Sequence, residues 1–166
     1  MERLTSQISP TFESMVAAVS SFSDAEFNAV PFAKSWTGGQ VAEHVKLSIE
    51  GIPELFAAET AASDRDPEEK IEMVAGVFLD FDKKYESPES IVPEEKTYDR
   101  QDYLKFYKDF LRTLGELAAN LDMSRICLGF EIPGFGPMTR LEFLSFVLFH
   151  TQRHVRQMEN IRKALN

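Results

Sequence analysis

The feature that most constrains this chain is its closing segment, Thr139 to about Leu165, which is predicted to form one long helix. It begins at a capping box, with Thr139 at the N-cap and Glu142 three residues later. Two histidines, His150 and His154, stand four residues apart and therefore share one face of that helix. Apolar residues recur at helical spacing on the same side: Leu141, Phe143, Leu144, Val147, Leu148, Val155, Met158, Ile161 and Leu165. Both imidazoles are therefore expected to point into the core.

The remaining histidine, His44, lies on a second amphipathic segment. This helix is predicted to start at the capping box Thr37–Gln40, flanked by Trp36 and Val41 as a hydrophobic staple, and to fade before Ser63. Its inward side carries Val41, Val45, Ile49, Ile52 and Phe56. Three neutral nitrogen donors that face one core from two helices meet the requirement of a metal site with open coordination positions.

Two further long helices are predicted, Thr5–Ser21 and Asp99–Asn120, the second with Leu104, Tyr107 and Leu111 among its inward residues. Four long amphipathic segments, with a long connection between the second and the third, favour an all-α four-helix bundle with a crossover. The length of 166 residues fits a single domain, residues 1–166, with a substantial core.

The connections between these helices are expected to be irregular. Residues 22–35 form a link, and Asp64–Pro93 is a covering region in which Pro67–Lys70 opens a short helix. Val77–Phe81 reads equally as the end of that helix or as extended chain. The Gly- and Pro-containing segment Ser124–Met138 is expected to be a loop. These two loop regions are candidates for the walls of a pocket.

Composition excludes several functional classes. A net charge of −9 disfavours nucleic acid and anionic membrane surfaces, which attract clustered Lys and Arg. No stretch is apolar for long enough to span a bilayer, and the start of the chain lacks the apolar region of a signal peptide. The lone cysteine, Cys127, cannot form an internal disulfide. A cytoplasmic location is therefore expected.

Two established metal-binding patterns do not fit the histidines. A carboxylate di-iron bundle needs a glutamate three residues before a histidine, and here those positions hold Val41, Val147 and Thr151. The zinc-protease motif needs a glutamate directly after its first histidine, where this chain has Thr151. From the residues alone, three core histidines, each hydrogen-bonded to a neighbour, remain an alternative to a metal site.

Two segments carry a resemblance to a known family. Ser35–His44, which reads SWTGGQVAEH, and His150–Gln157, which reads HTQRHVRQ, resemble the corresponding helices of the DinB/YfiT-like metalloenzyme superfamily, and Pro133–Thr139 resembles the loop before the last helix. The resemblance implies a four-helix bundle that holds a divalent metal, usually nickel or zinc, through His44, His150 and His154. It also implies a homodimer.

Characterised members of that family include thiol transferases that join a low-molecular-weight thiol, such as bacillithiol or mycothiol, to an electrophile. The expected function is therefore a metal-dependent thiol S-transferase that acts on a small electrophile. A metal-dependent hydrolase is an alternative, because the same site could activate water. A non-catalytic, stress-linked bundle with a structural or vestigial metal site is a second alternative.

The roles of several other residues stay open at this level. Gln40 and Gln157 lie one turn from His44 and His154 and could orient them, although the capping box already accounts for Gln40. Cys127 is expected to be a buried apolar residue and Trp36 a core residue. Four charged residues are expected to face solvent: Glu43, Arg153, Arg156 and Lys163.

Overall fold

The computed structural model describes residues 2–83 and 85–166, which are mostly helical. The longer helices are α2 (Ile8–Ser20), α4 (Gly38–Ile49), α7 (Arg100–Asn120) and α8 (Arg140–Ala164). The shorter ones are α1 (Glu2–Thr5), α3 (Asp24–Phe27), α5 (Ile52–Ala57), α6 (Ile71–Phe78) and the 3-10 turn η1 (Glu89–Ile91). The predicted all-α class is confirmed, with the addition of one two-stranded sheet.

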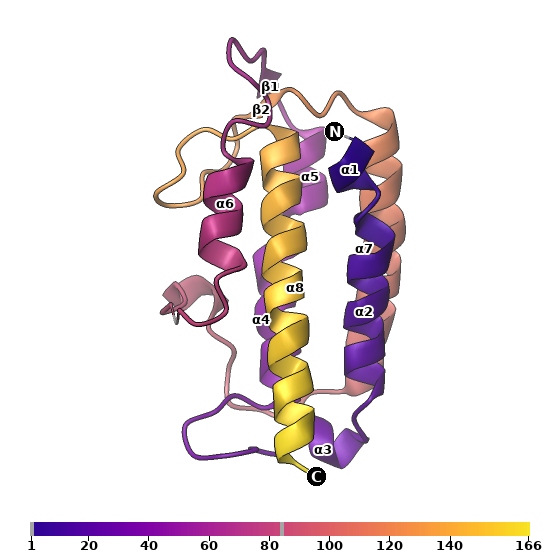
Figure 1. Cartoon of the computed structure of the whole chain (residues 1–166). Coiled ribbons are helices and arrows are strands. Elements are labelled where there is room, and N and C mark those ends of the chain that lie inside the picture. The colour runs from indigo at the N-terminus through magenta and orange to yellow at the C-terminus, as the bar shows by residue number, and fades with distance from the viewer. Residues whose placement is uncertain (1, 84) are drawn as a thin grey trace.

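Helix α8 lies at the centre of the molecule (Figure 1) and packs against α2, α4 and α6. The fourth long helix, α7, packs mainly against α2 and also touches α4. Every residue from Arg140 to Thr151 is buried. The first half of α8 is therefore covered on all sides, whereas its second half has one exposed face.

Near the N-terminus, a proline lies in the first turn of a helix at two places. The predicted helix Thr5–Ser21 is present as α2, which starts at Ile8 with Pro10 in its first turn, and the separate short helix α1 precedes it. The second predicted helix ends as α4 and resumes as α5, which has Pro53 in its first turn. A proline is tolerated in a first turn because the N–H groups there have no partner within the helix.

The connections carry more regular structure than expected. Residues 22–35 contain α3, which begins at a capping box formed by Ser23 and Glu26. The loop between α7 and α8 contains β2 (Ile126–Cys127), which pairs antiparallel with β1 (Thr60–Ala61). The short helix α6 is present, but its predicted start at Pro67–Lys70 is wrong, because those residues form a turn and the helix begins at Ile71.

The two long C-terminal helices begin where the sequence predicts. Asp99 is the N-cap of α7, and Thr139 forms the predicted capping box with Glu142 at the start of α8. Tyr107 of α7 is buried as expected, and Leu104 and Leu111 are half-buried against the core. None of the helices in the described part of the chain is long and apolar enough to cross a membrane.

Glu142 ties the start of α8 to the start of α6. Its carboxylate, which is fully buried, accepts hydrogen bonds from Arg65 at 2.6 and 2.7 Å and from the backbone N–H of Lys70 at 2.9 Å. Burial would raise the pKa of this carboxyl, but the hydrogen bonds from Arg65, Thr139 and Lys70 hold it below its ordinary value. Because Lys70 and Pro67 bind the cap of α8, residues 67–70 turn instead of continuing α6.

Replacing Glu142 by Ala should destabilise the protein by about 3–5 kcal/mol, because it leaves the guanidinium of Arg65 and two buried N–H groups without their acceptor. Urea unfolding at pH 7 measures this loss. Glu26→Ala is the matched control, since Glu26 holds the same position in an exposed capping box. Equal losses in the two variants would contradict this account of Glu142.

Candidate metal centre

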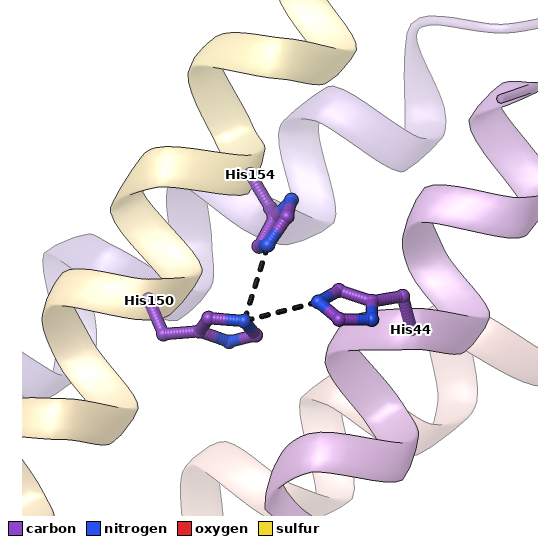
Figure 2. Close-up of side chains that lie close together, drawn as sticks. All are labelled: His44, His150 and His154. Carbon is purple, nitrogen blue, oxygen red and sulfur yellow. Dashed lines mark hydrogen bonds between the residues drawn. The ribbon is translucent and has the colours of Figure 1, made fainter. Parts of the chain in front are cut away.

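The three histidines of the chain meet at one point in the core (Figure 2). The Nε2 atom of His150 lies 3.1 Å from Nε2 of His44 and 3.1 Å from Nε2 of His154. One ligand atom from each residue lies within 4.8 Å of the other two. Helix α4 supplies His44, and α8 supplies the other two from successive turns. The predicted convergence of the three side chains is confirmed.

The outer ring nitrogens show which Nε2 atoms are free to act as ligands. Nδ1 of His44 lies 2.8 Å from the carbonyl oxygen of Ile91, which can only accept, so Nδ1 carries the proton. Nδ1 of His154 likewise donates to Oε1 of Gln157 at 2.7 Å. Both residues therefore present an Nε2 lone pair to the centre. A histidine that ligates a metal usually has such an acceptor behind it.

His150 is held differently. Its ring stacks on Phe146, with centroids 5.3 Å apart, and meets the edge of Phe78 at 5.5 Å. Its Nδ1 atom is buried and has no hydrogen-bond partner within residues 2–83 and 85–166. Contacts with apolar rings fix the orientation of the His150 imidazole, whereas a hydrogen bond from Nδ1 fixes the orientation of His44 and of His154.

Burial keeps all three imidazoles neutral at pH 7. Desolvation lowers the pKa of His44, although the hydrogen bond to Ile91 partly offsets this effect. Desolvation, followed by the nearby histidines, lowers the pKa of His150 well below its ordinary value. For His154, burial is again the main cause and lowers the pKa to about 3. A neutral imidazole is the form that binds metal ions.

The residues fit a divalent metal ion. Nitrogens bound to one tetrahedral zinc at about 2.0–2.1 Å lie roughly 3.3–3.4 Å apart, close to the two 3.1 Å separations here. Without a cation, the single proton that neutral His150 can hold on Nε2 satisfies only one of its two Nε2 neighbours at a time. Imidazole nitrogens suit zinc, nickel, copper and iron.

Little of the site is open to solvent. The exposed fractions of His44, His150 and His154 are 3%, 5% and 8%. Trp36, expected as a core residue, packs against the core and also lies 5.1 Å from His44, ring to ring. Of the two predicted walls, Asp64–Pro93 contributes Phe78 and Ile91 to the surroundings of the histidines.

The structure resolves most of the secondary candidates. Gln40 makes the reciprocal capping hydrogen bonds with Thr37, as expected. Cys127 is buried, as expected, and burial raises the pKa of its thiol to about 11. The expectation that Glu43 faces solvent is wrong, because its side chain is 13% exposed and accepts a 2.6 Å hydrogen bond from Tyr103.

Two contacts at the site have no counterpart in the sequence analysis. The carbonyl of Ile91 acts through its backbone, so no side-chain pattern could reveal it. Arg153 was expected in solvent but donates to the backbone carbonyls of Asp80, at 2.7 Å, and Lys83. The position of Arg153 in the sequence, between the inward-facing His150 and His154, could have indicated that it lies near the site.

A family comparison agrees with this arrangement. The family model for the DinB superfamily matches residues 7–158, which include all three histidines. The chain belongs to the DinB superfamily. No curated protein and no solved structure matches it. The DinB assignment confirms the resemblance noted in the sequence, and it rests on most of the chain rather than on the histidine motif alone.

The metal-free protein should lose stability as the pH falls below about 6.5, the pKa of histidine in the unfolded chain. The unfolded chain then takes up protons that the folded chain, with its lowered histidine pKa values, does not. The free energy of unfolding should fall by about 1.4 kcal/mol per pH unit for each histidine that stays neutral.

Urea unfolding between pH 7.5 and 5.5 in the presence of a chelator measures this slope. His150→Phe removes one titrating ring and keeps an aromatic packing partner for Phe78 and Phe146. Its slope should be shallower by about one histidine's share. An unchanged slope would show that the folded protein does not hold His150 neutral.

Proposed function

We propose that this DinB-superfamily protein is a divalent-metal-dependent enzyme, most specifically a thiol S-transferase that acts on a small electrophile. Its metal ligands are His44, His150 and His154, and nickel or zinc is the metal. The observation that carries the proposal is the convergence of three Nε2 atoms, two of them freed as lone pairs by protonated Nδ1 atoms. The metal association of the DinB superfamily supports it.

The protein's own residues prepare the site in this proposal. Ile91 and Gln157 fix the tautomers and the ring planes of two ligands. Trp36 and Phe78 surround the centre with apolar surface, which limits water and strengthens electrostatic interactions inside. A divalent metal held there would lower the pKa of a thiol or a water molecule that it binds, which supplies a nucleophile at neutral pH.

The same proposal extends to the architecture. The helices α2, α4, α7 and α8 form the four-helix bundle of a single domain, and the connection from α5 to α7 is the long crossover. Both ligand-bearing helices belong to this bundle, so the donors are held by rigid elements rather than by loops. The substrate is a small molecule, with a low-molecular-weight thiol as the nucleophile.

Two alternatives use the same three histidines. A hydrolase would activate water in place of a thiol. A non-catalytic protein would hold the metal as a structural element, and the low exposure of the histidines is the observation that favours this alternative. A structural metal supplies much of the folding free energy, whereas a catalytic metal mainly supplies reactivity.

Metal analysis of protein purified without an affinity tag tests the proposal directly. The wild type should carry about one nickel or zinc ion per chain, and His154→Ala should carry none because it removes a ligand. The variant should lose only about 1–3 kcal/mol of stability, as is typical of a single substitution. Conjugation of a small thiol to a chloronitrobenzene should disappear with the metal.

Gln152→Ala is the matched control, because Gln152 lies on the same helix and binds Thr11, away from the histidines. It should keep metal and activity. A large fall in melting temperature on chelation of the wild type, with no activity toward thiols, would instead support the structural alternative. A wild type with no affinity for these metals would overturn the proposal.

We also propose that the protein is a homodimer. Leu128 and Phe130 each expose 55% of their surface beside an apolar groove that includes Leu47 and Leu55. Burying such surface is favourable. Light scattering at high micromolar concentration should give twice the chain mass of 18.9 kDa. Phe130→Ser should shift the protein toward the monomer, and a monomeric wild type would contradict this proposal.

A further inference from the structure

The chain between α6 and α7 reaches the histidines at both of its ends. The covering segment, residues 79–83 and 85–91, leaves α6 next to Phe78, whose ring meets His150. It ends at Ile91, whose carbonyl accepts the hydrogen bond from His44. Figure 1 shows it below the end of α6, at the edge of the molecule opposite α7, before it runs to the start of α7. The covering segment therefore spans from one histidine-bearing helix to the other.

Arg153 holds the first half of the covering segment against α8. Its guanidinium donates to the carbonyl oxygen of Asp80 at 2.7 Å, to that of Lys83, and more weakly to that of Phe78 at 3.5 Å. The ring of Tyr85 lies 5.6 Å from the guanidinium carbon. These carbonyls follow the end of α6, where backbone acceptors lack partners and a cation is favourable.

Among the described residues, few other contacts hold this half in place, apart from Leu79, which packs against the core. Phe81 is 40% exposed and Tyr85 is 52% exposed. The ion pair between Lys83 and Asp80 is internal to the segment and exposed, so it contributes little. Arg156 adds one contact, with its guanidinium carbon 4.7 Å from the centre of the Phe81 ring. A segment with few buried apolar contacts opens at low free-energy cost.

We propose that the covering segment acts as a gate that controls access to the three-histidine centre, and that Arg153 keeps this gate closed. As a gate for metal and substrate, this inference rests on the proposed function. Opening occurs at residues 80–83 and Tyr85, because Ile91 stays bound to His44 at the other end. The same helix thus carries two of the proposed ligands and, between them, the residue that closes the entrance.

A gate has a kinetic signature that a ligand-positioning residue lacks. Loosening a gate raises the rates of metal loading and metal extraction by the same factor, so the equilibrium affinity stays constant. Loosening a ligand raises extraction alone and weakens affinity. The hydrogen bonds of Arg153 lie on the covering segment and not on any histidine, so the first behaviour is expected.

The test compares wild type with Arg153→Leu, Arg153→Lys and, as a control for lost charge, Arg112→Leu on the exposed side of α7. In metal-free protein, Arg153→Leu should speed amide hydrogen exchange at Leu79 and Asp82, whose N–H groups are hydrogen-bonded in this half, by about tenfold or more, since hydrogen bonds to charged groups are strong. Exchange in α2 and α7 should not change. Arg153→Lys, which keeps one cationic donor group, should lie between the two.

A second measurement on metal-free protein follows access itself. Carbethoxylation of the three histidines by diethyl pyrocarbonate, followed by mass spectrometry, should accelerate in Arg153→Leu by a factor similar to that of exchange. With zinc, loading and extraction by a chelating dye should both accelerate by about tenfold, with the dissociation constant within about threefold of wild type. Arg112→Leu should match wild type throughout.

Each of the following results would contradict the proposal that Arg153 keeps the covering segment closed over the site. Unchanged exchange in Arg153→Leu would show that Arg153 does not hold the segment. Faster exchange with unchanged carbethoxylation would show that the segment does not control access. Weaker zinc affinity with an unchanged loading rate would make Arg153 a ligand-positioning residue. A wild type that binds no zinc would contradict the proposed function alone. Exchange and carbethoxylation are measured on metal-free protein, so they test the role of Arg153 whether or not the protein binds zinc.

Discussion

The rest of this structure depends on the burial of the first half of α8 on every side. A helix in that position cannot leave polar side chains without partners, because an unpaired buried group is costly. Glu142 is therefore matched by Arg65, and Ser145 and Thr151 bond back to carbonyls of their own helix. The pairing of Glu142 with Arg65 also fixes how α8 sits against its neighbours.

Two of the histidines meet the same requirement at Nδ1, whereas Nδ1 of His150 has no partner among the described residues. His44 and His154 have acceptors behind them, whereas all three Nε2 atoms point at one another. Three core histidines with a structural role alone would be expected to pair each imidazole with its own neighbour. Here the lone pairs are concentrated at one point, which a cation stabilises better than any arrangement of protons among them. The chemistry of the donors and the fold of the DinB superfamily lead to the same centre.

Local signals made much of this predictable from the sequence. The capping boxes at Thr37 and Thr139 identified the starts of both histidine-bearing helices, and the four-residue spacing of His150 and His154 placed them on one face. What could not be predicted depends on contacts between distant segments. The start of α6 is displaced because Lys70 binds Glu142, and Glu43 is withdrawn from solvent by Tyr103, sixty residues later. Periodicity carries no information about such partners.

The burial of Cys127 has a consequence for the proposed function, in which the protein brings a thiol and an electrophile together. Such a protein is exposed to alkylation by its own substrates, and a reactive cysteine would be consumed over repeated turnovers. Cys127 is the only thiol in the chain, is 1% exposed, and stays protonated at neutral pH because burial raises its pKa to about 11. Since the thiolate is the reactive form, the fold leaves this protein resistant to alkylation by the compounds that it is proposed to process.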